Sequence, residues 1–202
     1  MDMEGFVYLD EFIPGLRWDA KYAGCDNFMG RPARGYNANR TVATVEAAAA
    51  LKGVYAAAQR LNLGLLVFDA YRPARAVADF CEWVAAPEDY SRKAIHYPYV
   101  DKKDMLRLGY IAARSGHSRG STIDLTLTDF EGQPLDMGTI FDFMDSLSHH
   151  GAAGLTELQT RNRELLRRMM LEGGFTDYSE EWWHYRLRDE PYPDTYFDFE
   201  IV

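Results

Sequence analysis

The sequence is poor in the features that mark several large classes of protein. Only two of its 202 residues are cysteines, Cys25 and Cys81, which is too few for a disulfide framework, so we expect free thiols. No uninterrupted apolar run approaches the ~20 residues of a membrane-spanning helix. The chain also lacks internal repeats, low-complexity tracts and flexible linkers. We therefore expect residues 1–202 to form a single domain.

Positive charge is scarce as well. The chain has 22 lysines and arginines against 31 aspartates and glutamates, a formal net charge of -9. This balance gives no electrostatic footprint for a polyanion, so we expect neither nucleic acid nor an anionic membrane as partner. Residues 1–10 lack the basic and apolar regions of a secretory signal, which predicts a cytoplasmic protein. A small neutral or zwitterionic substrate is compatible with this net charge. The sequence does not predict the oligomeric state.

What the chain does contain is enough apolar and aromatic material for one core: 47% of its residues are hydrophobic and 14% aromatic. Apolar residues recur at helical spacing over Thr44–Leu61, after Pro73 and after Thr156. The expected core faces of these helices are, in order, Val45, Leu51, Val54, Tyr55 and Ala58; Val77, Phe80, Cys81 and Val84; Leu165, Leu166, Met169 and Met170.

The limits of these elements are also encoded locally. Pro73 is expected in the first turn of the second helix. Thr156 and Gln159 predict a capping box, and Gly173-Gly174 ends the third helix. Leu65–Phe68 has the composition of a buried strand. Helices and strands mix without a regular βαβ rhythm, which favours an α+β fold with a mainly antiparallel sheet flanked by helices.

Two short segments contain the residue types of a hydrolytic zinc site. His117 and Asp124 are seven residues apart, an odd separation that would place them on opposite faces of one continuous strand. Gly116 and Gly120 bracket the histidine and predict a loop there, while residues 121–127 alternate as a strand with Asp124 on its polar face. A catalytic zinc takes three such protein ligands and leaves one position open.

The second segment offers Glu181 and His184, again at an odd separation. We expect Glu181 in the turn that enters a strand over Trp182–Leu187. From that turn it would act as a base that takes a proton from the attacking water, rather than as a metal ligand. Arg72 leads from the buried strand into the second helix, where its permanent charge can stabilise an oxyanion. The alternatives for Arg72 are a structural ion pair with Asp69 and a helix-cap contact.

These motifs, taken together, resemble the D-alanyl-D-alanine dipeptidases of the VanX type, a group of zinc D,D-peptidases whose fold is shared with hedgehog signalling domains. The resemblance covers nearly the whole chain. It is carried by Cys25–Phe28, Tyr36–Arg40, Asp69-x-Tyr-Arg72-Pro73, Ser115-x-His117-x6-Asp124, Met137–Asp142, Ser148–His150, Glu181-x-Trp-His184 and Leu187–Pro193.

The resemblance implies one zinc ion per chain, held by His117, Asp124 and His184. It also implies Glu181 as general base and acid, and Arg72 as the group that stabilises the transition state. The implied reaction is hydrolysis of D-alanyl-D-alanine or a close D,D-dipeptide, in glycopeptide resistance or in recycling of cell-wall dipeptide.

In the small pocket of this family, Ser115 would contact the substrate carboxylate, and Asp142 with Tyr22 its ammonium group. Gly116 and Thr122 depart from the family pattern, which has a serine and an alanine there. These two departures place substrate preference in question more than the class of reaction.

Several of these residues also have structural interpretations. A carboxylate at a helix terminus would explain Asp142. His149-His150 suggests packing or capping rather than a second metal, and His96 a structural or surface position. For the whole protein, the alternatives are a D,D-carboxypeptidase that trims longer peptidoglycan peptides and a hedgehog-like protein that binds zinc without catalysis. Retention of both Glu181 and Arg72 favours an enzyme, since a structural zinc needs neither.

Overall fold

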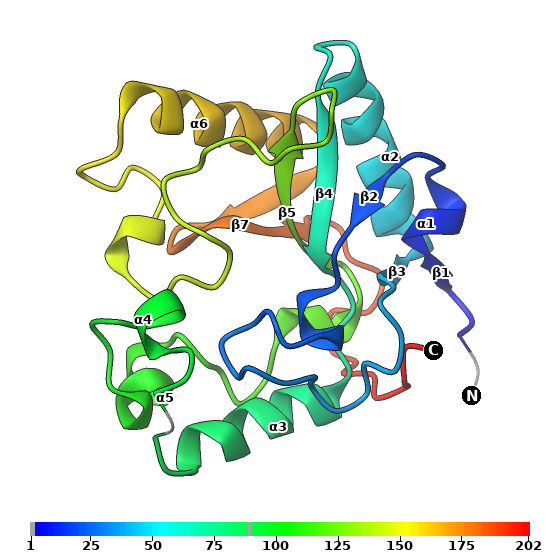
Figure 1. Ribbon diagram of the computed structural model, residues 1–202. Coiled ribbons are helices and arrows are strands. Elements are labelled where there is room, and N and C mark those ends of the chain that lie inside the picture. Colours follow the sequence, from blue (N-terminus) through cyan, green and yellow to red (C-terminus); the bar gives the residue numbers. More distant parts are fainter. Residues whose placement is uncertain (1–2, 89) are drawn as a thin grey trace.

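The computed structural model describes residues 3–88 and 90–202, and has the predicted α+β fold (Figure 1). Over these residues the elements are β1 (Phe6–Tyr8), α1 (Leu9–Phe12), β2 (Arg17–Trp18), η1 (Lys21–Ala23), β3 (Val42–Thr44), α2 (Val45–Gln59), β4 (Gly64–Asp69), α3 (Ala74–Ala85), α4 (Lys93–His96), η2 (Lys102–Asp104), α5 (Met105–Leu108), η3 (Gly116–Arg119), β5 (Thr122–Thr128), η4 (Ser146–Ser148), α6 (Glu157–Glu172), β6 (Phe175–Tyr178) and β7 (Glu181–Leu187).

A five-stranded sheet with the order β2-β4-β5-β7-β6 forms the centre of the molecule. The pairs β4–β5, β5–β7 and β7–β6 are antiparallel, and only the short β2 runs parallel to its neighbour β4. Helices α2 and α6 pack against each other and against the sheet. Helix α3 lies at the opposite end of the molecule from α6, with α4 and α5 beside it (Figure 1). The mainly antiparallel sheet flanked by helices confirms the predicted fold class.

The predicted helix limits follow from local hydrogen bonding. The Thr44 side chain accepts a hydrogen bond from the amide of Ala47 and begins α2. At α6 the capping box between Thr156 and Gln159 is present, and Gly173 terminates the helix. Each cap satisfies amide or carbonyl groups that a helix end leaves without intrahelical partners.

Three details of the helices differ from the sequence prediction. Val45 is 39% exposed, because at about 100° per residue it lies roughly 180° around the helix from the buried Val54. Pro73 precedes α3 as its N-cap, with extended backbone, instead of lying in the first turn. Cys81 is only half-buried, since Trp83, which the prediction did not include, takes part in the core face of α3. Both cysteines are free thiols, as expected.

The segment after β7 packs back onto the domain and contacts η3. Phe199 is buried and its ring stacks on that of Tyr71, with centroids 4.1 Å apart. The amide of Phe197 donates a hydrogen bond to the carbonyl of Ser118 in η3, at 2.8 Å. This tail therefore helps to fix η3 relative to the sheet. Over the described residues, none of the helices combines the length and apolarity that a bilayer crossing requires.

Candidate metal centre and active site

The three predicted ligands come from neighbouring elements. Asp124 of β5 lies directly opposite His184 of β7 in the antiparallel ladder, a position in which Cβ atoms are about 5 Å apart. His117 lies in η3, just before β5, and its Nε2 is 3.2 Å from Asp124 Oδ2. His184 Nδ1 is 3.3 Å from His117 Nε2 and 3.1 Å from Asp124 Oδ1. The short helix removes His117 from the strand, as its odd spacing from Asp124 required.

Hydrogen bonding around these groups shows that the three side chains suit a metal ion. His117 Nδ1 is 2.7 Å from the carbonyl of Ala70. A carbonyl only accepts, so Nδ1 carries the proton and Nε2 directs its lone pair at His184 and Asp124. Asp124 Oδ1 is buried without a hydrogen-bond partner. Two nitrogens and one carboxylate oxygen converging in this way fit Zn²⁺, and the Ala70 carbonyl provides the outer hydrogen bond usual for a metal-bound histidine.

The charges in the cluster influence one another. Burial disfavours ionisation of Asp124, but the adjacent imidazoles of His117 and His184 outweigh it and lower the pKa of this carboxyl. Burial opposes protonation of His184, yet its close contact with the Asp124 carboxylate raises the pKa of its imidazole. The carboxylate is therefore ionised and available as an oxygen ligand.

Glu181 lies beside this cluster. Its Oε2 is 3.4 Å from His184 Nδ1, and burial raises the pKa of its carboxyl to about 7 against the opposing effect of His184. The sequence analysis placed Glu181 in the turn before the strand. This prediction was wrong by one residue, since Glu181 is the first residue of β7. The ladder with β6 shifts register between Asp177 and Tyr178, opposite this point. Such irregularities re-aim side chains.

The side chain of Arg72 is 12% exposed, and it both forms an ion pair and lines the pocket. Its Nε donates to Asp69 Oδ2 at 2.9 Å, the predicted structural ion pair. At the same time it lines the pocket, and its Nη2 is 3.6 Å from Asp124 Oδ2. The guanidinium lies over the rings of Tyr22 and Phe80, at 4.8 and 5.1 Å from their centroids. These contacts hold the charge in one orientation.

Tyr22 and Asp142, predicted for the substrate ammonium group, contact each other. The Tyr22 hydroxyl donates to Asp142 Oδ2 at 2.7 Å. Burial raises the pKa of the Asp142 carboxyl despite this hydrogen bond. Asp142 has φ 57° and lies in a turn, so the helix-terminus interpretation was wrong. A non-glycine residue in this left-handed conformation must be held there by its surroundings.

Ser115 precedes η3 as its N-cap, and its Oγ accepts a hydrogen bond from the amide of His117 at 3.3 Å. Gly116 follows. A Cβ at this position would lie 3.1 Å from Oγ1 of Thr122, a buried hydroxyl that has no hydrogen-bond partner. The two departures from the family pattern are thus in contact: the threonine occupies space that a larger residue at position 116 would need.

One pocket of about 210 Å³ contains the whole predicted site. All eight residues named from the sequence line it: Tyr22, Arg72, Ser115, His117, Asp124, Asp142, Glu181 and His184. The sequence gave no signal for the wall formed by Gly109–Ala112, which belongs to no regular element. It also did not indicate Tyr178, whose ring is 5.5 Å from that of His184. Trp183 is buried and lines the pocket as well.

The remaining histidines lie outside the metal cluster. His150 packs against the ring of Tyr185, with centroids 6.3 Å apart, in agreement with the expected packing role. Among the described residues, the group that can share a metal ion is His117, Asp124 and His184. His96 is buried, so of its two expected positions the structural one is right.

Comparison with known proteins agrees with this geometry. The sequence model of a family described as D-ala-D-ala dipeptidase matches residues 2–202. The chain is 50% identical to the D-alanyl-D-alanine dipeptidase of Enterococcus faecalis over 198 residues, 98% of each chain. It is equally similar, with the same coverage, to that of Streptomyces coelicolor. The dipeptidase of Escherichia coli is 37% identical, over 92% of this chain and 86% of its own.

Proposed function

Because this chain belongs to the D-alanyl-D-alanine dipeptidases, a family of zinc peptidases, we propose that it hydrolyses the D-alanyl-D-alanine dipeptide to free amino acids. The observation that carries this proposal is the convergence of His117, Asp124 and His184 in one pocket with Glu181 and Arg72. A structural metal would need only the first three of these residues. The added carboxylate and guanidinium supply the other functions that hydrolysis requires.

We assign the zinc to His117 Nε2, Asp124 and His184 Nδ1, whose ligand atoms lie within 4.8 Å of one another. When bound, zinc polarises a carbonyl as a Lewis acid and makes water a stronger acid. The residues around it then orient the substrate and move protons.

Glu181 is the proposed base. Its carboxylate lies beside His184 and lines the pocket, from which the attacking water would approach the scissile carbonyl. It takes the proton of that water and then returns it to the leaving amine, so one residue serves both halves of the reaction.

Arg72 is the proposed stabiliser of the developing oxyanion. Asp69 and the two aromatic rings orient its guanidinium, so little reorganisation is needed as charge forms on the carbonyl oxygen.

We further propose that the two charged ends of the dipeptide are recognised at separate points. Asp142, with Tyr22 hydrogen-bonded to it, receives the ammonium group. Ser115 contacts the carboxylate, next to the metal ligand His117. A pocket of about 210 Å³ supports a small substrate, and a free dipeptide makes both charge-assisted contacts.

Amine release from D-Ala-D-Ala by zinc-loaded protein tests the reaction. N-acetyl-D-Ala-D-Ala and a pentapeptide ending in D-Ala-D-Ala are assayed in parallel. Strong preference for the free dipeptide is the expected result, because acetylation removes the ammonium and leaves Asp142 without its partner. Comparable rates on the blocked or longer substrates would favour the carboxypeptidase, and absence of turnover on all three would favour the zinc-binding protein without catalysis.

The cellular setting is a separate part of the proposal. We propose that residues 1–202 form one zinc D,D-dipeptidase domain that acts in the cytoplasm, which limited proteolysis and cell fractionation would test. Deletion of the gene separates the two biological roles. Increased sensitivity to a glycopeptide antibiotic would indicate resistance, and lost growth on D-Ala-D-Ala as nitrogen source would indicate recycling.

A further inference from the structure

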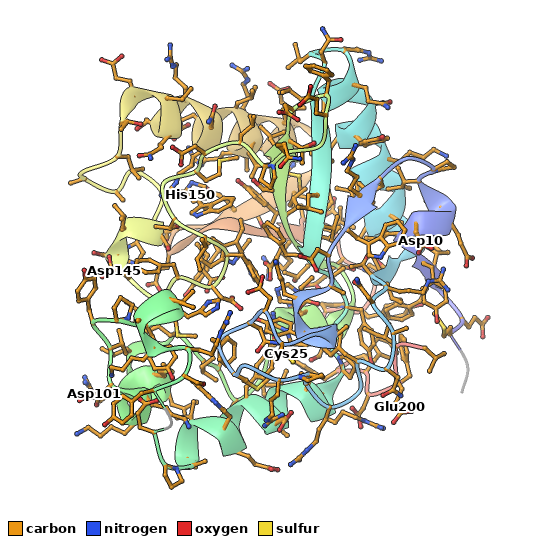
Figure 2. All side chains as sticks on the ribbon, in the orientation of Figure 1. Asp10, Cys25, Asp101, Asp145, His150 and Glu200 are labelled. Atoms are coloured by element: carbon orange, nitrogen blue, oxygen red, sulfur yellow. The ribbon has the colours of Figure 1, made fainter. Side chains whose placement is uncertain are left out.

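A buried arginine donates hydrogen bonds to both ends of the loop that carries Asp142. Arg163 of α6 is 2% exposed. Its Nε donates to the carbonyl of Met137 at 2.6 Å, and its Nη1 to the carbonyls of Leu147 and His149 at 2.9 and 3.0 Å. We call residues 137–149 the Asp142 loop. It lies between α6 and α4, where Figure 2 labels its member Asp145.

A chain of side-chain hydrogen bonds connects the same loop to the strand that carries Glu181 and His184. Trp182 Nε1 donates to Thr139 Oγ1 at 2.8 Å, and Arg163 Nη2 approaches the same oxygen at 3.4 Å. Since Thr139 Oγ1 thus accepts twice, its own proton is directed to Ser148 Oγ, 3.1 Å away. Ser148 Oγ in turn donates to the carbonyl of Phe143 at 2.6 Å. The chain ends at the residue that follows Asp142.

The choice of arginine at this position has a specific geometric reason. Among the described residues no carboxylate forms an ion pair with Arg163, so backbone carbonyls and one hydroxyl supply its acceptors. Burying a charge without a counterion is costly unless its donors are fully hydrogen-bonded. A planar guanidinium can reach acceptors on both sides of a loop at once, whereas a lysine offers one compact ammonium. Burial lowers the pKa of Arg163 only to about 10, so the cation persists at neutral pH.

The segment held in this way is the one that needs support. Apart from the short η4, the Asp142 loop has irregular backbone, and Asp142 itself has the left-handed φ of 57°. Such a conformation persists only where neighbouring structure fixes it. Arg163 contacts residues in both of the motifs Met137–Asp142 and Ser148–His150.

We propose that Arg163, together with the Thr139–Ser148 hydroxyl pair, is a positioning element that holds Asp142 where it recognises the ammonium group of the substrate. This inference rests on the proposed function, in which Asp142 reads that group. It predicts that loss of these contacts weakens binding of the free dipeptide and reduces discrimination against the N-acetylated one, while the chemical step is largely preserved.

The test compares Arg163→Met, Thr139→Val and Thr139→Ser, each loaded with zinc, for kcat and KM on D-Ala-D-Ala and N-acetyl-D-Ala-D-Ala. Arg163→Met keeps the hydrocarbon stem and removes every donor. We expect it to raise KM for the free dipeptide about tenfold with kcat changed roughly twofold or less, the pattern of lost substrate binding. Thr139→Val should act in the same direction, and Thr139→Ser, which retains the hydroxyl, should restore wild-type KM.

The matched control is Arg167→Met, one turn further along α6. Arg167 Nε contacts Asp177 of β6 at 2.6 Å instead of the Asp142 loop, so its loss should leave KM and the discrimination ratio unchanged. If Arg163→Met fails to fold, the KM values of the two Thr139 variants test the positioning role instead. Wild-type KM and discrimination in Thr139→Val, or a fall in kcat alone, would overturn the inference.

Asp142→Asn separates this inference from the function on which it rests. If Asp142→Asn abolishes discrimination between the two substrates while the Arg163 and Thr139 variants keep it, Asp142 reads the ammonium group and the positioning role is wrong. If Asp142→Asn keeps wild-type discrimination, the assignment of Asp142 fails, and the positioning inference fails with it.

Discussion

At the scale of single residues, Glu181 provides the sharpest distinction between an enzyme and a protein that merely binds zinc. Its carboxylate lies 3.4 Å from Nδ1 of His184, a proposed zinc ligand, but Glu181 is outside the proposed ligand set. We predict that Glu181→Gln retains zinc and fold while turnover falls about 10²–10⁴-fold, the usual contribution of a general acid–base group. Zinc content and kcat are measured on the same preparation. Loss of zinc would make Glu181 a ligand, and full activity would assign the base to another residue.

Gly116 and Thr122 offer a second residue-scale prediction. Since a Cβ at position 116 would approach Thr122 Oγ1 to 3.1 Å, Gly116→Ser should destabilise the protein by about 1–2 kcal/mol through overpacking. Thr122→Ala removes that oxygen, so the double variant should be more stable than the sum of the single changes implies. Urea denaturation of the four proteins measures this coupling. Strictly additive free energies would show that the two positions are independent.

At the scale of the elements, the caps were predictable because their signals are local. Thr156 and Gln159 form the expected capping box of α6. We predict that Thr156→Ala destabilises the protein by about 1 kcal/mol. Thr160→Ala, on the same helix, is the control, because the Thr160 hydroxyl donates to the carbonyl of Thr156 within the helix itself and alanine favours the helix interior. Equal effects of the two changes in urea denaturation would contradict a specific role for the cap.

Other parts of the site depend on contacts between elements, which sequence patterns do not contain. The separation of His117 and Asp124 required a break before β5, but the register that places Asp124 opposite His184 is set by strand pairing. The register shift in the ladder beside Glu181 likewise means that strict alternation along the strand does not predict the direction of its side chain. Gly109–Ala112 forms a pocket wall from irregular chain, where neither period nor motif gives a signal. The eight candidate residues, which the structure brings into one pocket, could be named from the sequence because the family resemblance implies them. The contacts of Arg163 could not, because they join segments 14 to 26 residues apart.

At the scale of the whole molecule, zinc should contribute to stability because its three proposed ligands join η3, β5 and β7. A ligand that binds only the folded state at about 100 times its Kd adds about 2.7 kcal/mol, which for a chain of this size raises the Tm by roughly 5–10 °C. We therefore predict that a chelator lowers the Tm of the wild-type protein by about this amount. His184→Ala is the control and should respond little. An equal response in both proteins would argue against the ligand assignment.

Acid should destabilise the molecule in two separate pH ranges. His96 is buried, and burial lowers the pKa of its imidazole to about 4 from 6.5, although its hydrogen bond with the Asp142 carbonyl opposes this. The neutral form is therefore favoured by folding. The contribution of neutral His96 to the free energy of unfolding is complete above pH 6.5. It decreases by at most about 3 kcal/mol as the pH falls towards 4.

The Asp79 carboxylate contributes to the acid sensitivity at lower pH than His96 does. Burial raises the pKa of its carboxyl, but hydrogen bonds from Arg31 and the Arg34 amide outweigh this and lower it below 3.8. Its contribution is present above pH 3.8 and is lost below. We expect urea denaturation of His96→Gln to show a smaller loss of stability between pH 6.5 and 4 than the wild type, with the loss below pH 4 unchanged. Identical slopes over the upper range would mean that another buried group, such as His150, whose imidazole pKa is also lowered by burial, accounts for the acid sensitivity.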